Sequence, residues 1–198
     1  MEKKLRMMKK GAGTLCQVFK VLTIVAAVLL LWMLAAWIFG LFCPPGQIQA
    51  QTTASGGWAV SAGPFTVLIR QGYLSPGTDL ATAAKAAYLI EGGMGLVGGA
   101  CQWAVLWLSF LLFDRAKENP FTEKSGRYLR RIGVLLCLGK MLYEVGKTIL
   151  FGVFAGGIWS FFPDGLPVNA VLSWLVLWAV SEIFDYGCLL QQEHDETL

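Results

Sequence analysis

The chain has 198 residues, of which 56% are hydrophobic and 15% charged, whereas about a quarter of the residues in a soluble domain are charged. Its formal net charge of +3 is too small to indicate a nucleic-acid-binding protein. Composition therefore excludes an ordinary soluble domain and direct nucleic-acid binding, and it predicts a protein whose main partner is the lipid bilayer.

Four apolar stretches are each long enough to cross the roughly 30 Å hydrocarbon core as a helix. The first is uncharged and longer than the roughly 7 to 15 apolar residues of a signal peptide, so we expect an uncleaved anchor. The sequence thus predicts an all-α membrane protein, with one four-helix transmembrane bundle covering residues 1–198. The predicted spans are residues 21–42, 88–113, 132–154 and 168–188.

The longest predicted loop covers residues 43–87 and is rich in Gly, Pro, Ser, Thr and Gln. Within it, two short β-favouring stretches, 58–61 and 65–70, flank the turn-forming pair Gly63-Pro64, which predicts a small β-hairpin. Asp79 is a candidate N-cap for a helical lead-in to the second span, because its carboxylate can accept hydrogen bonds from the first backbone N–H groups.

Basic residues indicate the orientation of the spans. Residues 1–20 and the short loop 114–131 hold twelve of the sixteen Lys and Arg residues, whereas the other two loops hold only Arg70 and Lys85. Because basic loops stay in the cytoplasm, both termini are predicted to be cytoplasmic. The tail, residues 189–198, is acidic, and acidic residues contribute little to orientation.

The third span is unusual because it contains Lys140, Glu144 and Lys147. Spacings of four and three residues place all three on one face of a helix. Each ionised group left in hydrocarbon costs a few kcal/mol on insertion scales, so this face must contact protein, water or its own charges. From the rise of about 1.5 Å per residue, similar depths predict that Lys147 pairs with Glu91, and Lys140 with Glu182.

Two interpretations of this charged face remain open. The three residues line a polar cavity that binds an ion, a proton or a small anion, or they form a self-neutralising ladder covered by neighbouring helices. The sequence has no internal repeat or broken helix of the kind that many transporters contain, which favours the ladder. It also has no nucleophile and base pairing, phosphate loop or metal-ligand spacing, so we expect no enzyme activity, no metal and no cofactor.

Gly95 and Gly99 form a G-x-x-x-G pattern in the second span. Such spacing lets two helix backbones approach closely in a membrane. We expect it to serve packing within the chain, with a homo-oligomer contact as the alternative. The five cysteines have no paired spacing, so a disulfide framework is not expected.

Two stretches, residues 117–133 and 181–198, resemble an uncharacterised bacterial family of four-span membrane proteins, domain of unknown function twenty-nine seventy-five. The first has a Pro-Phe-Thr turn before a Leu-Arg-x-Ile-Gly helix start, and the second a Glu-Ile-Phe, a Gly and an acidic tail. The matching positions are Pro120, Phe121, Thr122, Leu129, Arg130, Ile132, Gly133, Glu182, Ile183, Phe184, Gly187, Glu193, Asp195 and Thr197.

The resemblance implies a location in the bacterial cytoplasmic membrane and a role as membrane partner or sensor for a small helix-turn-helix transcription regulator. The resemblance implies no catalytic residues. The basic loop and acidic tail emerge on the same predicted face, where Asp185 is expected to meet Arg130 or Arg131. Ion pairs are also expected there between Arg127, Arg130 and Arg131 and the tail residues Glu193, Asp195 and Glu196. The predicted interaction surface comprises Pro120, Phe121, Thr122, Arg127, Arg130, Arg131, Asp185, Glu193, Asp195 and Glu196.

Two alternatives to this functional prediction remain. The basic loop by itself is also what a topology signal that touches anionic lipid would require. A rival function, from another class, is a small transporter or channel subunit that uses the charged face of the third span.

Overall fold

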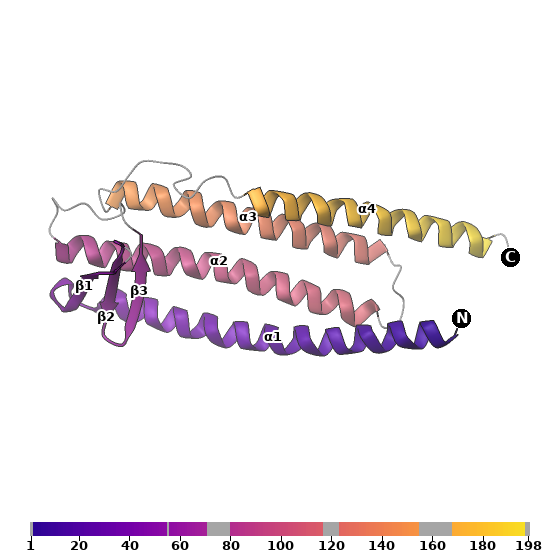
Figure 1. Cartoon of the computed structure of the whole chain (residues 1–198), viewed down its shortest axis with the longest axis horizontal. Coiled ribbons are helices and arrows are strands. Elements are labelled where there is room, and N and C mark those ends of the chain that lie inside the picture. Colours follow the sequence, from indigo (N-terminus) through magenta and orange to yellow (C-terminus); the bar gives the residue numbers. More distant parts are fainter. Residues whose placement is uncertain (1, 55, 71–79, 117–122, 155–167, 197–198) are drawn as a thin grey trace. The chain divides into compact units, whose positions relative to one another are not determined.

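A computed structural model describes residues 2–54, 56–70, 80–116, 123–154 and 168–196 (Figure 1). These residues form long α-helices and one small antiparallel sheet. In chain order the elements are α1 (Glu2–Phe42), η1 (Pro45–Gln47), β1 (Ile48–Thr52), β2 (Trp58–Ala62), β3 (Phe65–Ile69), α2 (Leu80–Ala116), α3 (Glu123–Phe154) and α4 (Val168–Glu196).

Three helices of the described part are long and apolar enough to cross a membrane: the segment Gly13–Phe42 of α1, all of α2, and the segment Val168–Leu190 of α4. The helix α3 differs in composition. Every 18-residue window within it includes at least three charged residues, and in its apolar half these are Lys140, Glu144 and Lys147. A predominantly helical protein with three candidate membrane spans is therefore confirmed, and composition alone does not identify α3 as a fourth span.

The helices extend beyond the predicted spans. The segment α2 already begins at Leu80, so the predicted helical lead-in is part of this helix, and α2 ends at Ala116. Helix α3 begins at Glu123, so residues 123–131 of the predicted loop 114–131 are helical. Most of the predicted tail belongs to α4, which ends at Glu196. The candidate cap Asp79 and the predicted loop 155–167 lie outside the described residues.

The predicted hairpin is confirmed as β2 and β3, which pair antiparallel with Ala62 opposite Phe65. Gly63 and Pro64 form the two-residue turn between them. Gly63 has a φ of +57°, a conformation that glycine adopts readily and that the first position of a tight hairpin turn requires. Proline fits the second position because its ring fixes φ near −65°.

The prediction missed β1, which pairs antiparallel with β2 to give the sheet order β1-β2-β3. Its sequence, Ile-Gln-Ala-Gln-Thr, has little β propensity, so a local pattern does not reveal it. The backbone pairing with β2 is what makes this segment a strand. Gln49 and Gln51 point to the outer face while Ile48 is buried, which is the alternation expected of a half-buried strand.

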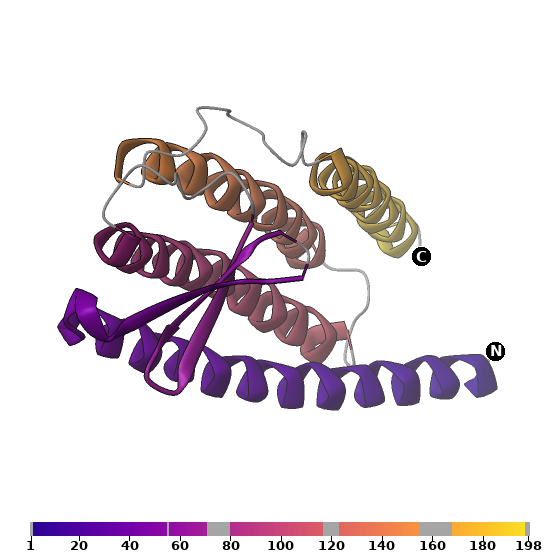
Figure 2. The same cartoon turned by 60° about the vertical axis from the view of Figure 1, so that its left-hand side comes forward.

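The chain divides into two compact units that share α1, α2 and α3. The first unit contains Met1–Ala27, Ala100–Gly139 and Pro167–Leu198, and the second contains Val28–Gly99 and Lys140–Leu166. The main buried apolar cluster lies within the second unit. There the strands run across α2 (Figure 2), and one face of the sheet, with Val60 and Ala62 fully buried, packs with small residues of α2, including Ala84 and Ala87.

Three side chains of this second unit connect the end of α1 to the beginning of α2. The hydroxyl of Tyr88 donates to the carbonyl of Ala36 at 3.0 Å, and the indole N–H of Trp37 donates to the carbonyl of Leu89 at 2.9 Å. The ammonium of Lys85 donates to the carbonyl of Leu41 at 3.1 Å. The last four carbonyls of a helix lack partners within it, so Lys85 satisfies one that α1 leaves open.

We expect Gly40→Ala to destabilise the protein, because a Cβ at this position would overlap the ring of buried Tyr88. Overpacking of this kind costs about 1 to 3 kcal/mol. Thermal unfolding in detergent, followed by tryptophan fluorescence, measures the effect. Gly13→Ala is the matched control in the same helix, because a Cβ there meets nothing within 4 Å. Equal stability of the two variants would contradict the packing of Tyr88 on α1.

Candidate functional site: a charged network on α3

The charged residues of α3 form an intrahelical ion pair in the second unit. The ammonium of Lys140 lies 2.6 Å from Glu144 Oε1, one helical turn away. Lys140 is half-exposed, whereas Glu144 is buried, with 7% of its side chain exposed. The pair therefore compensates the charge of a carboxylate that lies inside the unit, as the ladder interpretation predicts.

Lys147 is buried and meets a carboxylate of another helix. Its ammonium lies 3.8 Å from Glu91 Oε2 on α2, and the two side chains are only 8% and 16% exposed. The predicted pairing of Lys147 with Glu91 is thus confirmed. The other oxygen of Glu91 accepts a hydrogen bond of 2.5 Å from the hydroxyl of Tyr143. Glu91 is therefore held from α3 at both of its oxygens.

Tyr143 lies at the centre of the network, and the sequence analysis did not single it out. The ammonium groups of Lys140 and Lys147 lie 5.3 Å and 4.8 Å from the centroid of its ring. A cation within about 6 Å of an aromatic face is attracted by the ring quadrupole. The available signal was its spacing, three residues after Lys140 and four before Lys147, which places its ring between the two amines.

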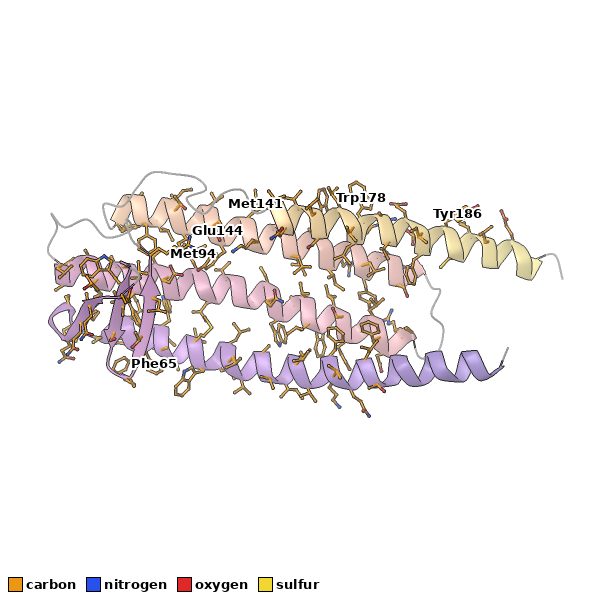
Figure 3. The ribbon with its side chains drawn as sticks, in the orientation of Figure 1. Phe65, Met94, Met141, Glu144, Trp178 and Tyr186 are labelled. Carbon is orange, nitrogen blue, oxygen red and sulfur yellow. The ribbon has the colours of Figure 1, made fainter. Side chains whose placement is uncertain are left out.

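One oxygen of the network has no hydrogen-bond partner. Glu144 Oε2 is buried and unpaired among the described residues, whereas Oε1 is bonded to Lys140. Figure 3 shows Glu144 and Met94 between the ribbons of α3 and α2. Buried polar atoms are almost always hydrogen-bonded, and an unpaired one is costly. This oxygen is therefore the atom of the network at which binding of a proton, a cation or a water molecule would supply a missing partner.

The predicted pairing of Lys140 with Glu182 is wrong. Glu182 belongs to the first unit, where Oε1 lies 3.2 Å from the guanidinium of Arg130 and accepts a hydrogen bond from the indole of Trp178. The depth estimate treated Arg130 as a residue of the loop. Arg130 is instead in the second turn of α3, from which its long side chain reaches α4, so the nearer cation takes this carboxylate.

Arg130 also makes the predicted contact with Asp185, at 2.5 Å, and its Nε donates to the hydroxyl of Ser181 at 3.0 Å. Gly126 makes room for this contact, because a Cβ there would overlap the carboxylate of Asp185. The guanidinium thus holds three polar residues of α4 at once. We call Arg130, Ser181, Glu182 and Asp185 the α3–α4 clasp.

The other residues of the predicted interaction surface are less connected. Arg127 and Arg131 are exposed and have no carboxylate partner among the described side chains, so the expected pairing with Glu193 is not found. Successive residues of a helix are rotated by about 100°, and Arg131 therefore points away from the side that carries Arg130. The residues Pro120, Phe121 and Thr122 and the side chains of Asp195 and Glu196 lie outside the described part.

The G-x-x-x-G pattern packs within the chain. In the second unit, Gly95 lies against Met33 of α1, and Gly99 lies against Leu30, so closely that added Cβ atoms would come within 3.1 Å and 2.7 Å of these side chains. The prediction of an intramolecular contact is confirmed. These glycines let α1 and α2 approach each other as small residues do in membrane helix pairs.

The second unit also contains an apolar pocket of about 310 Å³ that the sequence analysis did not predict. Aromatic side chains dominate its wall, and Trp32 contacts Phe65 edge-on. The polar ends of Tyr88 and Trp37 are already bonded to backbone carbonyls. The remaining lining is hydrocarbon-like, with Met33, Ala36, Pro64, Thr66, Val67 and Gly92.

Comparison with known proteins adds no identification. No protein-family model, curated protein or solved structure matches the chain. The resemblance to the four-span bacterial family therefore stays a prediction. Within the described ranges, no group of three or more His, Cys, Asp and Glu residues could hold a metal ion.

We expect Lys147→Met and Glu91→Gln each to destabilise the protein by about 3 kcal/mol, because each leaves a buried charge without its partner. The double variant should lose clearly less than the sum, since it removes both charges. Thermal unfolding of all three variants in detergent measures this coupling. Lys20→Met, at an exposed position of α1, controls for the loss of a lysine, and strictly additive effects would contradict the pairing.

Proposed function

We propose that this chain is a four-span membrane protein of the bacterial cytoplasmic membrane, with both termini in the cytoplasm. It senses a small charged signal and serves as a non-enzymatic partner of a cytoplasmic helix-turn-helix transcription regulator. The single observation that carries the proposal is the buried oxygen of Glu144 that has no hydrogen-bond partner among the described residues, within an otherwise compensated charge network. Intramembrane ionisable groups are costly, and proteins retain them mainly for function.

Charge compensation supports α3 as the fourth span. The 32 residues of α3 extend over about 48 Å, more than the roughly 30 Å of a hydrocarbon core. Its charges exclude it on composition alone, but Glu144 is paired with Lys140, and Lys147 with Glu91. A helix whose charges are neutralised in this way can be surrounded by protein in a membrane at much lower cost.

The α3–α4 clasp supports the cytoplasmic side of the proposal. A signal at Glu144 acts on α3, the same helix that holds α4 through Arg130. Beyond Asp185, the helix α4 continues to Glu196 and carries the exposed acidic residue Glu193. An acidic helical end is a suitable docking element for a basic DNA-binding regulator, whose charge it complements. The family resemblance points to the same class of partner.

A small transporter or channel subunit is the second candidate, because the same oxygen of Glu144 could take up a cation or a proton in transit. The continuity of the helices favours the sensor over the transporter. Within the described residues α2 and α3 are each unbroken, from Leu80 to Ala116 and from Glu123 to Phe154. Many transporters form their sites from discontinuous helices, whose free ends bind the substrate.

The proposed topology predicts that a green fluorescent protein fused after Leu198 fluoresces in bacterial cells, because this fusion partner folds in the cytoplasm. An alkaline phosphatase fused at the same place should be inactive. If α3 did not cross the membrane, the C-terminus would lie on the opposite face and the two results would be reversed. A fusion within residues 71–79, in the predicted outer loop, is the control and should give the opposite pattern.

The proposed partnership predicts that tagged protein, solubilised from membranes of its native host, co-purifies with a helix-turn-helix regulator identified by mass spectrometry. Neutralising the end of α4 with Glu193→Gln, Asp195→Asn and Glu196→Gln together should reduce its recovery about tenfold or more, as expected for charge pairs lost from an interface.

Arg70→Gln removes a charge from the predicted opposite face and serves as the control for that experiment, so recovery of the regulator should not change. Undiminished recovery with the triple variant would refute the assigned docking element. Recovery of no helix-turn-helix regulator with the unmodified protein would refute the proposed partnership itself.

A further inference from the structure

A pocket of about 210 Å³ in the first unit has a basic lining. It is lined by Arg115, in the last turn of α2, and by Arg127, Tyr128 and Arg131, in the second and third turns of α3. All four residues carry hydrogen-bond donors, and three are permanently charged. Two helices therefore place three guanidinium groups around one cavity, a property that neither the charged network nor the clasp shares.

These arginines differ from their neighbour Arg130 in their partners. Arg130 binds two carboxylates of α4, whereas Arg115, Arg127 and Arg131 have no ion pair among the described side chains. Arg127 and Arg131 are four residues apart, and like charges at this spacing repel each other on a helix. Three cations that have no ion pair among the described side chains repel one another, and an anion in the cavity between them would offset this repulsion.

The geometry of the pocket suits a phosphate group. The guanidinium of Arg115 is stacked over the ring of Tyr128 at 5.2 Å from the centroid, which restrains its plane and leaves its N–H groups available. Planar guanidinium groups bind phosphate oxygens with two parallel hydrogen bonds, a geometry that an ammonium cannot reproduce. An arginine that is already restrained, as Arg115 is by Tyr128, loses less conformational freedom on binding. This favours a specific site over general attraction to a charged surface.

We propose that this pocket binds a phosphate group, either the headgroup phosphate of an anionic phospholipid or a free phosphate ion. Its position at the ends of α2 and α3, both beside the predicted cytoplasmic boundary, is where anionic headgroups meet basic pockets between helices. The proposal goes beyond the sensor function and does not depend on it, because it concerns another ligand and involves neither Glu144 nor the acidic end of α4.

The experiment uses the full chain in detergent and counts bound lipid by native mass spectrometry during titration with phosphatidylglycerol or phosphatidylcholine. The protein should retain phosphatidylglycerol in preference to phosphatidylcholine. The triple variant Arg115→Gln, Arg127→Gln, Arg131→Gln should lose this preference, with about a fivefold loss for each arginine, as expected for one basic residue at an anionic surface. Equal retention of the two lipids by the unmodified protein, without binding of free phosphate, would overturn the proposal.

A second arm identifies the source of the phosphate. Inorganic phosphate and glycerol 3-phosphate are titrated against the same protein, and binding is followed by the shift in unfolding temperature. A shift with both soluble ions identifies a phosphate site that does not need a bilayer, and phosphatidylglycerol binding without such a shift identifies a lipid site. Either result supports the pocket only if the triple variant abolishes it.

Two further variants separate the site from general charge and from misfolding. Lys20→Gln removes a positive charge outside the pocket lining and should leave phosphatidylglycerol binding unchanged. Arg127→Lys keeps the charge and the fold but removes the bidentate guanidinium donor, so it should weaken binding. If Lys20→Gln weakened binding as much as Arg127→Lys, attraction would be non-specific and the proposed pocket would be wrong.

Discussion

The structure of this protein depends on one constraint: an ionised side chain that leaves water must find an opposite charge or a hydrogen bond. Helix α3 carries three such groups in its apolar half and satisfies the constraint in two ways. Lys140 compensates Glu144 within the helix, and Lys147 reaches Glu91 on α2. Tyr143 connects the two pairs, since its hydroxyl binds Glu91 and its ring faces both amines. Within the part of the chain that the structure describes, Glu144 Oε2 is the one buried carboxylate oxygen of this network without a hydrogen-bond partner.

The same principle separates the arginines in the first turns of α3 into one that is paired and two that are not paired with any described side chain. Arg130 is held against α4 where Gly126 leaves room for Asp185, whereas Arg127 and Arg131 point elsewhere and find no carboxylate among the described side chains. Paired arginines stabilise contacts between helices, and unpaired ones around a cavity favour an anion. The first turns of α3 thus carry both a structural contact, made by Arg130, and a candidate binding site, formed by Arg127 and Arg131. The sequence alone does not distinguish these arginines.

Much of this organisation could be predicted from the sequence, and the failures have physical causes. Glu91 was identified as the partner of Lys147 because depth along two straight helices is a linear function of residue number. The hairpin was predictable from Gly63-Pro64, whose turn chemistry is local. Strand β1 was not predictable, because its pairing with β2, and not its own β propensity, makes it a strand.

The predicted partner of Glu182, Lys140, was wrong because depth says nothing about rotation around a helix or about the reach of Arg130. Tyr143 was missed because aromatic residues are common in apolar helices.

The two ways of compensating charge on α3 have different consequences for membrane insertion. The pair of Lys140 and Glu144 is local to one helix, so it forms as soon as α3 does. Lys147 depends on Glu91, and α2 is synthesised before α3. If α3 crosses the bilayer as proposed, its carboxylate partner is already in place when Lys147 leaves the ribosome. The two helices then enter the lipid as a hairpin, and an α3 separated from α2 would have to carry an unpaired ammonium group into hydrocarbon.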